Sequence, residues 1–130
     1  MATKGSTARF PSKIMRNPDC IFCQIADGTI PKEFTFQNDE LMAFPDIHPC
    51  APTHLLIVPK DHVMRSIAEM EPGQEALIGR MMVAAKQLAE EAGIAENGYR
   101  LVFNVRHHAG QEVDHVHLHV LGGKKLGPVA

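Results

Sequence analysis

The sequence predicts an α+β fold, in which a mainly antiparallel sheet carries one long helix and a short N-terminal helix. Short apolar or alternating segments bounded by Pro, Gly and Asn are typical of strands. A broad apolar band at helical spacing occurs over residues 73–92. The predicted elements follow in the order helix, hairpin, strand, long helix and two strands, and this order favours antiparallel neighbours in one sheet.

Length and composition indicate a single domain over residues 19–130. Of the 130 residues, 45% are hydrophobic and the formal net charge is −2, so no broad attraction to nucleic acid or to an anionic membrane is expected. No apolar run approaches the roughly 20 residues that cross a bilayer. We therefore expect a soluble protein with neither nucleic acid nor membrane as a partner, and a phosphate-bearing ligand would bind at a local site.

Residues 1–18 contain basic residues and no acidic one, which predicts a disordered basic tail. A weak organellar transit peptide is the alternative, although the segment has no clear amphipathic helix. The cysteines, Cys20, Cys23 and Cys50, are an odd number with one close pair, and this pattern does not suggest a secreted disulfide framework. The expected location is therefore the reducing cytoplasm.

The first predicted elements are a helix and a hairpin. The helix covers residues 19–27, with Asp19 as its N-cap and Gly28 at its end. Residues 33–37 and 41–44 are predicted to pair as antiparallel strands across a turn that contains Asn and Asp.

The central part of the chain is predicted to contain a loop, a buried strand and the long helix. The loop covers residues 45–52, because its three prolines cannot occupy a central strand. Residues 54–58 form the strand, which ends at a proline. The helix covers residues 73–92 and is closed by Gly93. Its methionines are assigned to the core, with a partner surface or a dimer interface as the alternative.

The most informative segment follows a predicted strand over residues 99–105 and a loop over residues 106–112. It is His115-Val116-His117-Leu118-His119-Val120. Alternate side chains of a strand face opposite sides, so the three imidazoles would share one face within about 13 Å. We expect a central strand whose apolar face packs on the long helix while its histidine face opens to a ligand cleft. The alternatives are chance clustering and an adventitious metal patch; the Gly-Gly turn that follows argues against an affinity tag.

This run resembles the signature of the histidine triad nucleotide-binding proteins, in which three histidines alternate with hydrophobic residues. Further motifs resemble the Hint branch of that family and extend the resemblance over about residues 20–123. They are Ile30-Pro31, Ala43-Phe44, Asp46-Ile47, Ala51-Pro52-Thr53-His54, Ile57-Val58-Pro59-Lys60, Gly98-Tyr99-Arg100, Asn104, Gly110-Gln111 and Gly122-Gly123. The number and order of these motifs argue against an accidental match.

The resemblance implies hydrolysis or transfer at the α-phosphate of AMP derivatives, usually at the P–N bond of an adenosine 5′-phosphoramidate or on an aminoacyl adenylate. His117 matches the nucleophile, which would form a nucleotidyl-histidine intermediate that water then hydrolyses; a neutral imidazole has the free lone pair that this role needs. His119 would bind the phosphate oxygens. His54 would orient or polarise the site, with a core histidine as the alternative.

The resemblance also places the substrate contacts. Asp46 would accept the ribose hydroxyls, although a turn cap is the alternative for this residue. Asn104 and the amides of Gly110 and Gln111 would act on the phosphate side. The purine slot would consist of Phe22, Ile25, Ile30, Phe44 and Ile47. Each of these apolar residues taken singly is more typical of a core.

A Cys-x-x-Cys pair completes the set of candidate residues. In some histidine triad proteins and in related uridylyltransferases, such a pair joins two histidines, which here are His62 and His115. Cys20, Cys23, His62 and His115 would then hold a structural zinc ion rather than one that activates water; a free, reduced cysteine pair is the alternative. Cys50 is assigned to a buried position, and the solvent-facing surface is predicted for His48, His107 and His108.

The resulting hypothesis is a purine nucleoside phosphoramidase with a structural zinc ion and no cofactor for its chemistry. A homodimer is implied by the resemblance. Two other functions stay open, namely dinucleoside polyphosphate hydrolysis and nucleotide binding by a regulatory protein whose hydrolysis is incidental.

Overall fold

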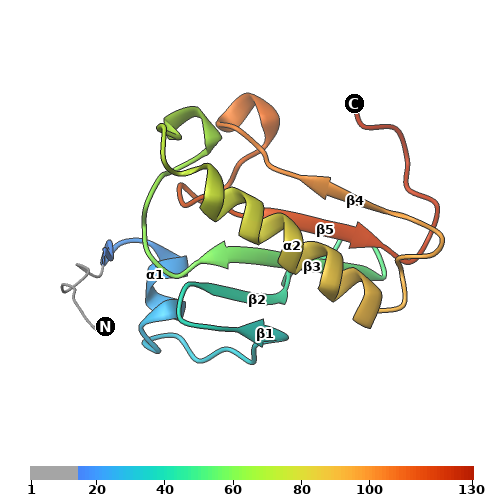
Figure 1. Ribbon diagram of the computed structural model, residues 1–130, viewed down its shortest axis with the longest axis horizontal. Helices are drawn as coiled ribbons and strands as arrows, with labels where there is room; N and C mark the ends of the chain where they lie inside the picture. Colours follow the sequence, from blue (N-terminus) through green and yellow to red (C-terminus); the bar gives the residue numbers. More distant parts are fainter. Residues whose placement is uncertain (1–14) are drawn as a thin grey trace.

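The computed structural model describes residues 15–130, which fold into one five-stranded antiparallel sheet with a helix on each face (Figure 1). The strand order is β1-β2-β3-β5-β4. The strands are β1 (Phe36–Gln37), β2 (Leu41–Pro45), β3 (Thr53–Pro59), β4 (Tyr99–Val102) and β5 (Leu118–Gly122). The helices are α1 (Ile21–Ala26) and α2 (Glu75–Glu91), and 3₁₀ turns occur at η1 (Ile67–Glu69) and η2 (His107–Ala109).

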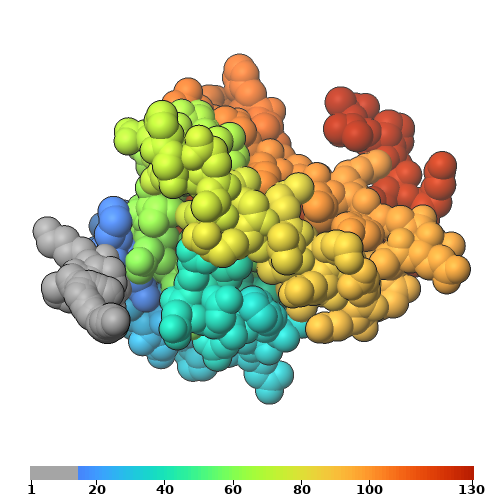
Figure 2. Space-filling view, in the orientation of Figure 1, coloured from blue at the N-terminus to red at the C-terminus, as the bar shows by residue number. Residues whose placement is uncertain are grey.

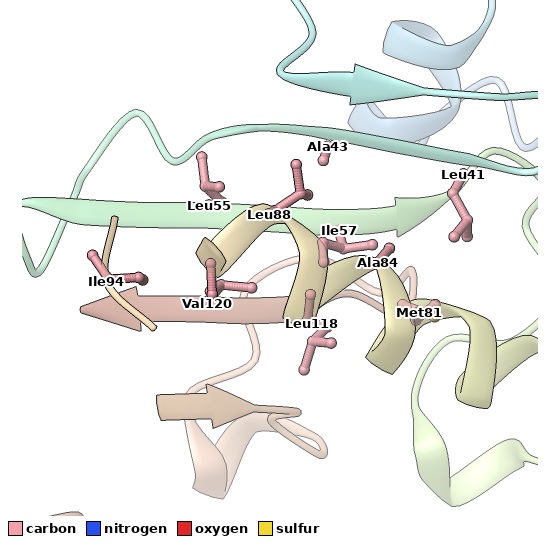
Figure 3. Close-up of a cluster of buried hydrophobic side chains, with 12 residues drawn as sticks. Leu41, Ala43, Leu55, Ile57, Met81, Ala84, Leu88, Ile94, Leu118 and Val120 are labelled. Atoms are coloured by element: carbon pink, nitrogen blue, oxygen red, sulfur yellow. The ribbon is translucent and has the colours of Figure 1, made fainter. Parts of the chain in front are cut away.

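Helix α2 covers one face of the sheet, and it lies across the side of the molecule seen in Figure 2. Small and long apolar side chains alternate along its inner stripe, which lets the helix approach the strands closely. Figure 3 shows this core, which contains Met81, Ala84, Ala85, Leu88 and Ala89 of α2 packed on Leu41, Ala43, Leu55, Ile57, Leu118 and Val120 of the sheet. The core assignment is confirmed for Met81, which is fully buried, whereas Met82 is 42% exposed.

Helix α1 covers only part of the opposite face. Its Phe22, Cys23 and Ile25 pack on β2 and β3 through residues that alternate with those under α2, namely Met42, Phe44, Leu56 and Val58. His54 and His119 face the same side, because Leu56 pairs with His119 in the register of β3 and β5. The sheet therefore has one face that packs on α2 and one face that is open beside α1.

Several predicted boundaries differ from the structure. Helix α1 has Cys20, not Asp19, at its N-cap position, because the N–H of Asp19 is turned back to the Asn17 side chain at 2.9 Å. Strand β1 is shorter than the predicted 33–37. Helix α2 begins at Glu75 rather than at Gly73, whose φ of +98° is incompatible with a right-handed helix. The predicted closure at Gly93 is confirmed by its φ of +75°.

The strand ends also differ. Pro45 was assigned to the loop but ends β2, where it pairs with Leu55. A terminal position suits proline because the next ladder bond comes from the N–H of Asp46 to the carbonyl of His54, at 2.9 Å. Strand β4 ends at Val102, three residues before its predicted end.

The histidine segment is only partly a strand. Strand β5 begins at Leu118, so His115 and His117 precede it, because the N–H of Val116 donates to the carbonyl of Met64 at 3.1 Å instead of to the sheet. The expected alternation persists all the same, since Phe22 packs edge-on against the rings of both His115 and His117. Strand β5 lies inside the sheet, between β3 and β4, while β3 is the middle strand.

The disordered tail predicted over residues 1–18 falls mostly on residues 1–14, outside the described residues. Within the described part, Met15 accepts a hydrogen bond from the N–H of His62 and Arg16 pairs with Asp27 and Asp61. No helix among residues 15–130 has the length and apolar character needed to cross a membrane.

Candidate functional site

The open part of the second sheet face borders a cavity of about 460 Å³. Its apolar lining consists of Ile21, Phe22, Ile25, Phe44, Ile47, Leu56 and Val113. Its other lining residues are Lys32, Asp46, His48, Cys50, His54, Asn104, Gly110, Glu112, His117 and His119. A mostly apolar wall with a few convergent polar groups is the combination typical of small-molecule sites.

The ring of His117 is held by a hydrogen bond to the backbone. Its Nδ1 lies 2.7 Å from the carbonyl oxygen of His115, and because a carbonyl only accepts, Nδ1 carries the proton. The lone pair of the neutral ring is therefore on Nε2. Phe22 packs edge-on at a centroid distance of 5.1 Å, and burial lowers the pKa of His117. His117 thus presents the tautomer and the charge state that a nucleophile needs.

His54 and His119 form a directed chain of hydrogen bonds. The backbone N–H of Cys50 donates to Nδ1 of His54 over 3.0 Å, so the neutral His54 ring carries its proton on Nε2. That N–H donates to Nδ1 of His119, 2.9 Å away. The proton of His119 is then on Nε2, which has no hydrogen-bond partner among the described residues.

Burial, together with the neighbouring rings of His117 and His54, lowers the pKa of His119 to about 4. At neutral pH this residue is therefore an uncharged hydrogen-bond donor in the cavity. A donor that is held in place before the substrate arrives needs no reorganisation when charge develops on a phosphate oxygen.

The two carboxylate oxygens of Asp46 have different surroundings. Oδ1 accepts a hydrogen bond from the N–H of His48 at 2.8 Å, and Oδ2 lies 3.4 Å from Nε2 of His54. One oxygen thus caps the turn after β2, while the residue also lines the cavity. The turn cap and the cavity carboxylate are compatible, because they use different oxygens of the same group.

A second cluster lies beside this cavity and consists of Cys20, Cys23, His62 and His115, whose ligand atoms all lie within 4.8 Å of one another. Nδ1 of His115 is 3.3 Å from Sγ of Cys20 and 3.6 Å from Sγ of Cys23, and it is 3.1 Å from Nδ1 of His62. Tetrahedral zinc with ordinary bond lengths has S–N edges of about 3.5 Å and N–N edges of about 3.3 Å. Both the donor set and the spacing fit zinc.

The backbone also selects the tautomer of His115. Its Nε2 lies 2.7 Å from the carbonyl of Pro59 and must donate, so the lone pair on Nδ1 faces the thiols. Burial lowers the pKa of His115 to about 4, which keeps that lone pair free. Burial raises the pKa of the Cys23 thiol, and the N–H of Asn17, 3.3 Å from its Sγ, acts in the opposite direction.

Comparisons with known proteins agree with this arrangement. Residues 27–126 match the HIT domain family. The chain belongs to the HIT domain family. It is 44% identical over 111 residues to the "Purine nucleoside phosphoramidase" of Escherichia coli strain K12, a match that covers 85% of this chain and 92% of that protein.

Solved structures of HIT proteins share the fold. A HIT family hydrolase from Legionella pneumophila Philadelphia 1 matches with a TM-score of 0.81 at 47% identity, covering 84% of this chain and 96% of that one. A histidine triad protein from Clostridium difficile matches with a TM-score of 0.83 at 38% identity, covering 88% and 98%. The family resemblance and the α+β fold inferred from the sequence are both confirmed.

The structure brings most of the predicted site residues of this HIT protein together. Those that line the cavity are His54, His117, His119, Asp46, Asn104, Gly110, Phe22, Ile25, Phe44 and Ile47. Ile30 and Gln111 are not among the lining residues. Ile30 packs against the α1 side of the core, where its N–H donates to the carbonyl of Gln24 at 3.1 Å.

Gln111 ties together three backbone segments. Its Oε1 accepts from the N–H of Arg106, and its Nε2 donates to the carbonyls of Arg65 and Val113, all within 2.9 Å. The main-chain N–H of Gln111 donates to the carbonyl of Arg106, and that of Gly110 to the carbonyl of His107. These amides are used inside the loop, so a phosphate contact from them would require the loop to change.

Other features of the site were not foreseen. Cys50 was assigned to a buried position, which is wrong: it is exposed and lines the cavity, because the Pro-rich loop holds it at the surface while its N–H reaches His54. His48, His107 and His108 are exposed as predicted. The roles of Asn17 beside Cys23 and of Lys32 in the cavity lining depend on tertiary contacts that no local pattern signals.

Proposed function

We propose that this HIT protein is a purine nucleoside phosphoramidase that cleaves at the α-phosphate of AMP derivatives through a nucleotidyl-His117 intermediate. The observation that carries the proposal is the bond from Nδ1–H of His117 to the carbonyl of His115. This bond fixes the tautomer with a free lone pair on Nε2, in a residue that lines the cavity. The name of the Escherichia coli relative supports the same reaction class.

The reaction would have two displacements at phosphorus. In the first, the Nε2 lone pair of His117 forms the new P–N bond, while the P–N bond of the substrate breaks and its electron pair stays on the departing nitrogen, which takes up a proton. In the second, water attacks phosphorus and the bond to Nε2 breaks. One hydrogen of that water balances the proton taken up by the amine, and its hydroxyl remains on AMP. Nδ1–H stays bonded to the backbone throughout and stabilises the cationic ring of the intermediate.

The other residues would position the nucleotide. The Nε2–H of His119 would donate to a phosphate oxygen, and the bond from His54 would keep that tautomer in place. We assign Asp46 to the ribose hydroxyls and Asn104 to the phosphate. The purine would lie between Phe22, Ile25, Phe44 and Ile47, the last of which is 71% exposed and offers free apolar surface. Ile30, Gly110 and Gln111 remain predictions as direct contacts.

We further propose that Cys20, Cys23, His62 and His115 hold a structural zinc ion. The cysteines precede residues 27–126, which match the family, so this part of the proposal rests on the cluster itself. Bound zinc would supply a rigid tetrahedral link between the start of α1 and the segment before β5. Four protein ligands would fill its coordination, and the chemistry at phosphorus would be left to the histidines.

A homodimer and a cytoplasmic location are also proposed. Val83 of α2 is 56% exposed and lies next to the exposed Met82, which leaves apolar surface free for a second copy. Thiols that are to bind zinc must stay reduced, as they do in the cytoplasm. Sedimentation equilibrium would test the dimer, and a single species of monomer mass would contradict it.

The decisive experiment follows one turnover of adenosine 5′-phosphoramidate. We expect AMP to be released and, after rapid acid-free quenching, an adenylyl group to be found on the peptide that contains His117 by mass spectrometry. A His108→Asn variant, which changes an exposed histidine outside the cavity, is the matched control and should behave like the unaltered protein. An adduct on a different residue, or no AMP, would contradict the proposal.

A further inference from the structure

A second cavity, of about 350 Å³, adjoins the catalytic cavity. Glu112 lines both cavities and therefore forms part of the wall between them. The second cavity has a charged lining that includes Arg65, Glu69, Arg106 and Asp114. Glu112 is therefore the carboxylate that connects this charged cavity to the one that contains His117.

The charges around the second cavity do not cancel. Arg65 and Glu69 neutralise each other through a close pair, with Nε of Arg65 2.6 Å from Oε2 of Glu69. Arg106 is the one other arginine of this lining, and two further carboxylates, Glu112 and Asp114, belong to it. Neither carboxylate has a hydrogen bond or an ion pair with the residues 15–130. The remaining negative charge is therefore available to a ligand.

Glu112 also lies beside the reacting group. It lines the catalytic cavity together with His117 and His119. Its backbone is restrained on both sides, because the side chain of Gln111 bonds to Arg106, Arg65 and Val113.

We propose that Glu112 is a specificity-determining residue, which favours nucleotides whose leaving group departs as an amine over nucleotides whose leaving group departs as a phosphate anion. The inference rests on the proposed function and specifies its substrate class. In P–N cleavage the bridging nitrogen keeps the electron pair and takes up one proton as it departs as an amine, and a second proton from solvent makes this amine cationic at neutral pH. In cleavage of a dinucleoside polyphosphate the departing phosphate instead gains negative charge.

The Glu112 carboxylate acts oppositely on these two leaving groups. It stabilises positive charge that develops on nitrogen and destabilises negative charge that develops on a phosphate oxygen. The unit charge of a carboxylate that is partly exposed to solvent changes the rate of each reaction by about three- to tenfold. The ratio of the two rates therefore changes by the product of both effects, about tenfold to a hundredfold, and it decreases at high ionic strength.

The test compares kcat/KM for adenosine 5′-phosphoramidate and for diadenosine triphosphate. In Glu112→Gln we expect the phosphoramidate value to fall three- to tenfold, and the ratio of the two values to fall at least tenfold. Asp114→Asn is the matched control, because it removes the same charge from the same segment but lines only the second cavity. Its ratio should change by less than about threefold.

A Glu112→Ala variant should repeat the result of Glu112→Gln, since the exposed side chain has no hydrogen-bond or ion-pair partner among residues 15–130 whose loss would unfold the protein. If both Glu112 variants keep the phosphoramidate value and the ratio within twofold of the unaltered protein, the inference is wrong while the proposed function stands. If the unaltered protein does not release AMP from the phosphoramidate, the proposed function is wrong and the inference falls with it.

Discussion

The two histidine-containing clusters of this HIT protein use similar residue types and differ in where their protons lie. Each brings at least three potential ligand atoms within 4.8 Å. In the cluster of Cys20, Cys23, His62 and His115, Nε2–H of His115 donates a hydrogen bond to the Pro59 carbonyl, and the lone pair on Nδ1 faces the thiols. In the cluster of Asp46, His54 and His119, the N–H of Cys50 occupies Nδ1 of His54 and leaves a proton in the centre.

This difference decides what each cluster can do. Converging lone pairs suit a metal ion, whereas a proton between Nε2 of His54 and Nδ1 of His119 suits an oriented donor chain and opposes a metal. Burial does not distinguish the clusters in the same way, since His62 of the first is half-buried and His54 of the second is buried. A set of ligand types therefore does not define a metal site until the backbone partners of each ring are known.

The largest effect should come from replacing His117, because this change should abolish turnover and leave the folded structure intact. In His117→Asn we expect kcat to fall at least about a thousandfold, because the nucleophile is gone. The zinc content and the melting temperature should stay close to those of the unaltered protein. Turnover assays and metal analysis on the same sample would check this, and turnover within tenfold of the original would remove His117 as nucleophile.

The second effect should appear mainly in stability. In Cys23→Ser we expect weaker zinc binding and a loss of about 4 kcal/mol at a free zinc concentration of 1,000 times the original Kd. For a domain of this size, that loss lowers the melting temperature by roughly 15 °C. Cys50→Ser is the matched control, because Cys50 is exposed and outside the cluster. An equal melting temperature in both variants would contradict the zinc assignment.

The third effect concerns the donor chain. His54→Asn should lower kcat by about ten- to a hundredfold, because His119 loses the partner that keeps its proton on Nε2. Metal content should not change. Steady-state kinetics would distinguish this positioning role from simple packing, since KM should change less than kcat. A variant with full kcat would show that His119 keeps its tautomer without His54.

The smallest effect is a pH dependence of stability. His119 has a pKa of about 4 in the folded protein, below the ordinary value of about 6.5. The unfolded chain therefore binds more protons at acidic pH, so this contribution is complete above pH 6.5 and is lost as the pH falls toward 4. Urea unfolding at pH 7 and pH 5 should show a smaller loss for His119→Asn than for the original protein. Equal losses would contradict the lowered pKa.

Local patterns in the sequence predicted the fold well, because a half-buried strand and a half-buried helix each repeat apolar residues at a characteristic spacing. Alternation around His117 correctly indicated a histidine face and an apolar face. It could not show that Val116 would bond to Met64 and delay the start of β5. The spacing of apolar residues is enough to predict the fold class. The end of a strand, in contrast, depends on a hydrogen-bond partner far away in the chain.

The candidate site was predictable in its residue types but not in its proton positions. The resemblance selected His54, His117 and His119, which share one cavity. The partners that fix their tautomers are backbone groups, for example the N–H of Cys50, and any residue other than proline can supply such a group. No sequence motif therefore indicates these backbone partners, and they are found only in the folded structure.

His115 connects its cluster to the nucleophile, since its ring faces the thiols while its carbonyl oxygen accepts a hydrogen bond from Nδ1–H of His117. Any displacement of His115 would also move the carbonyl group that holds the ring of His117. If the proposed zinc ion binds to this cluster, a partly loaded preparation would therefore contain two subpopulations with different turnover numbers, rather than molecules that all work at an intermediate rate. Progress curves from such a sample would measure the fraction of loaded molecules, and metal content would become a calibration for specific activity.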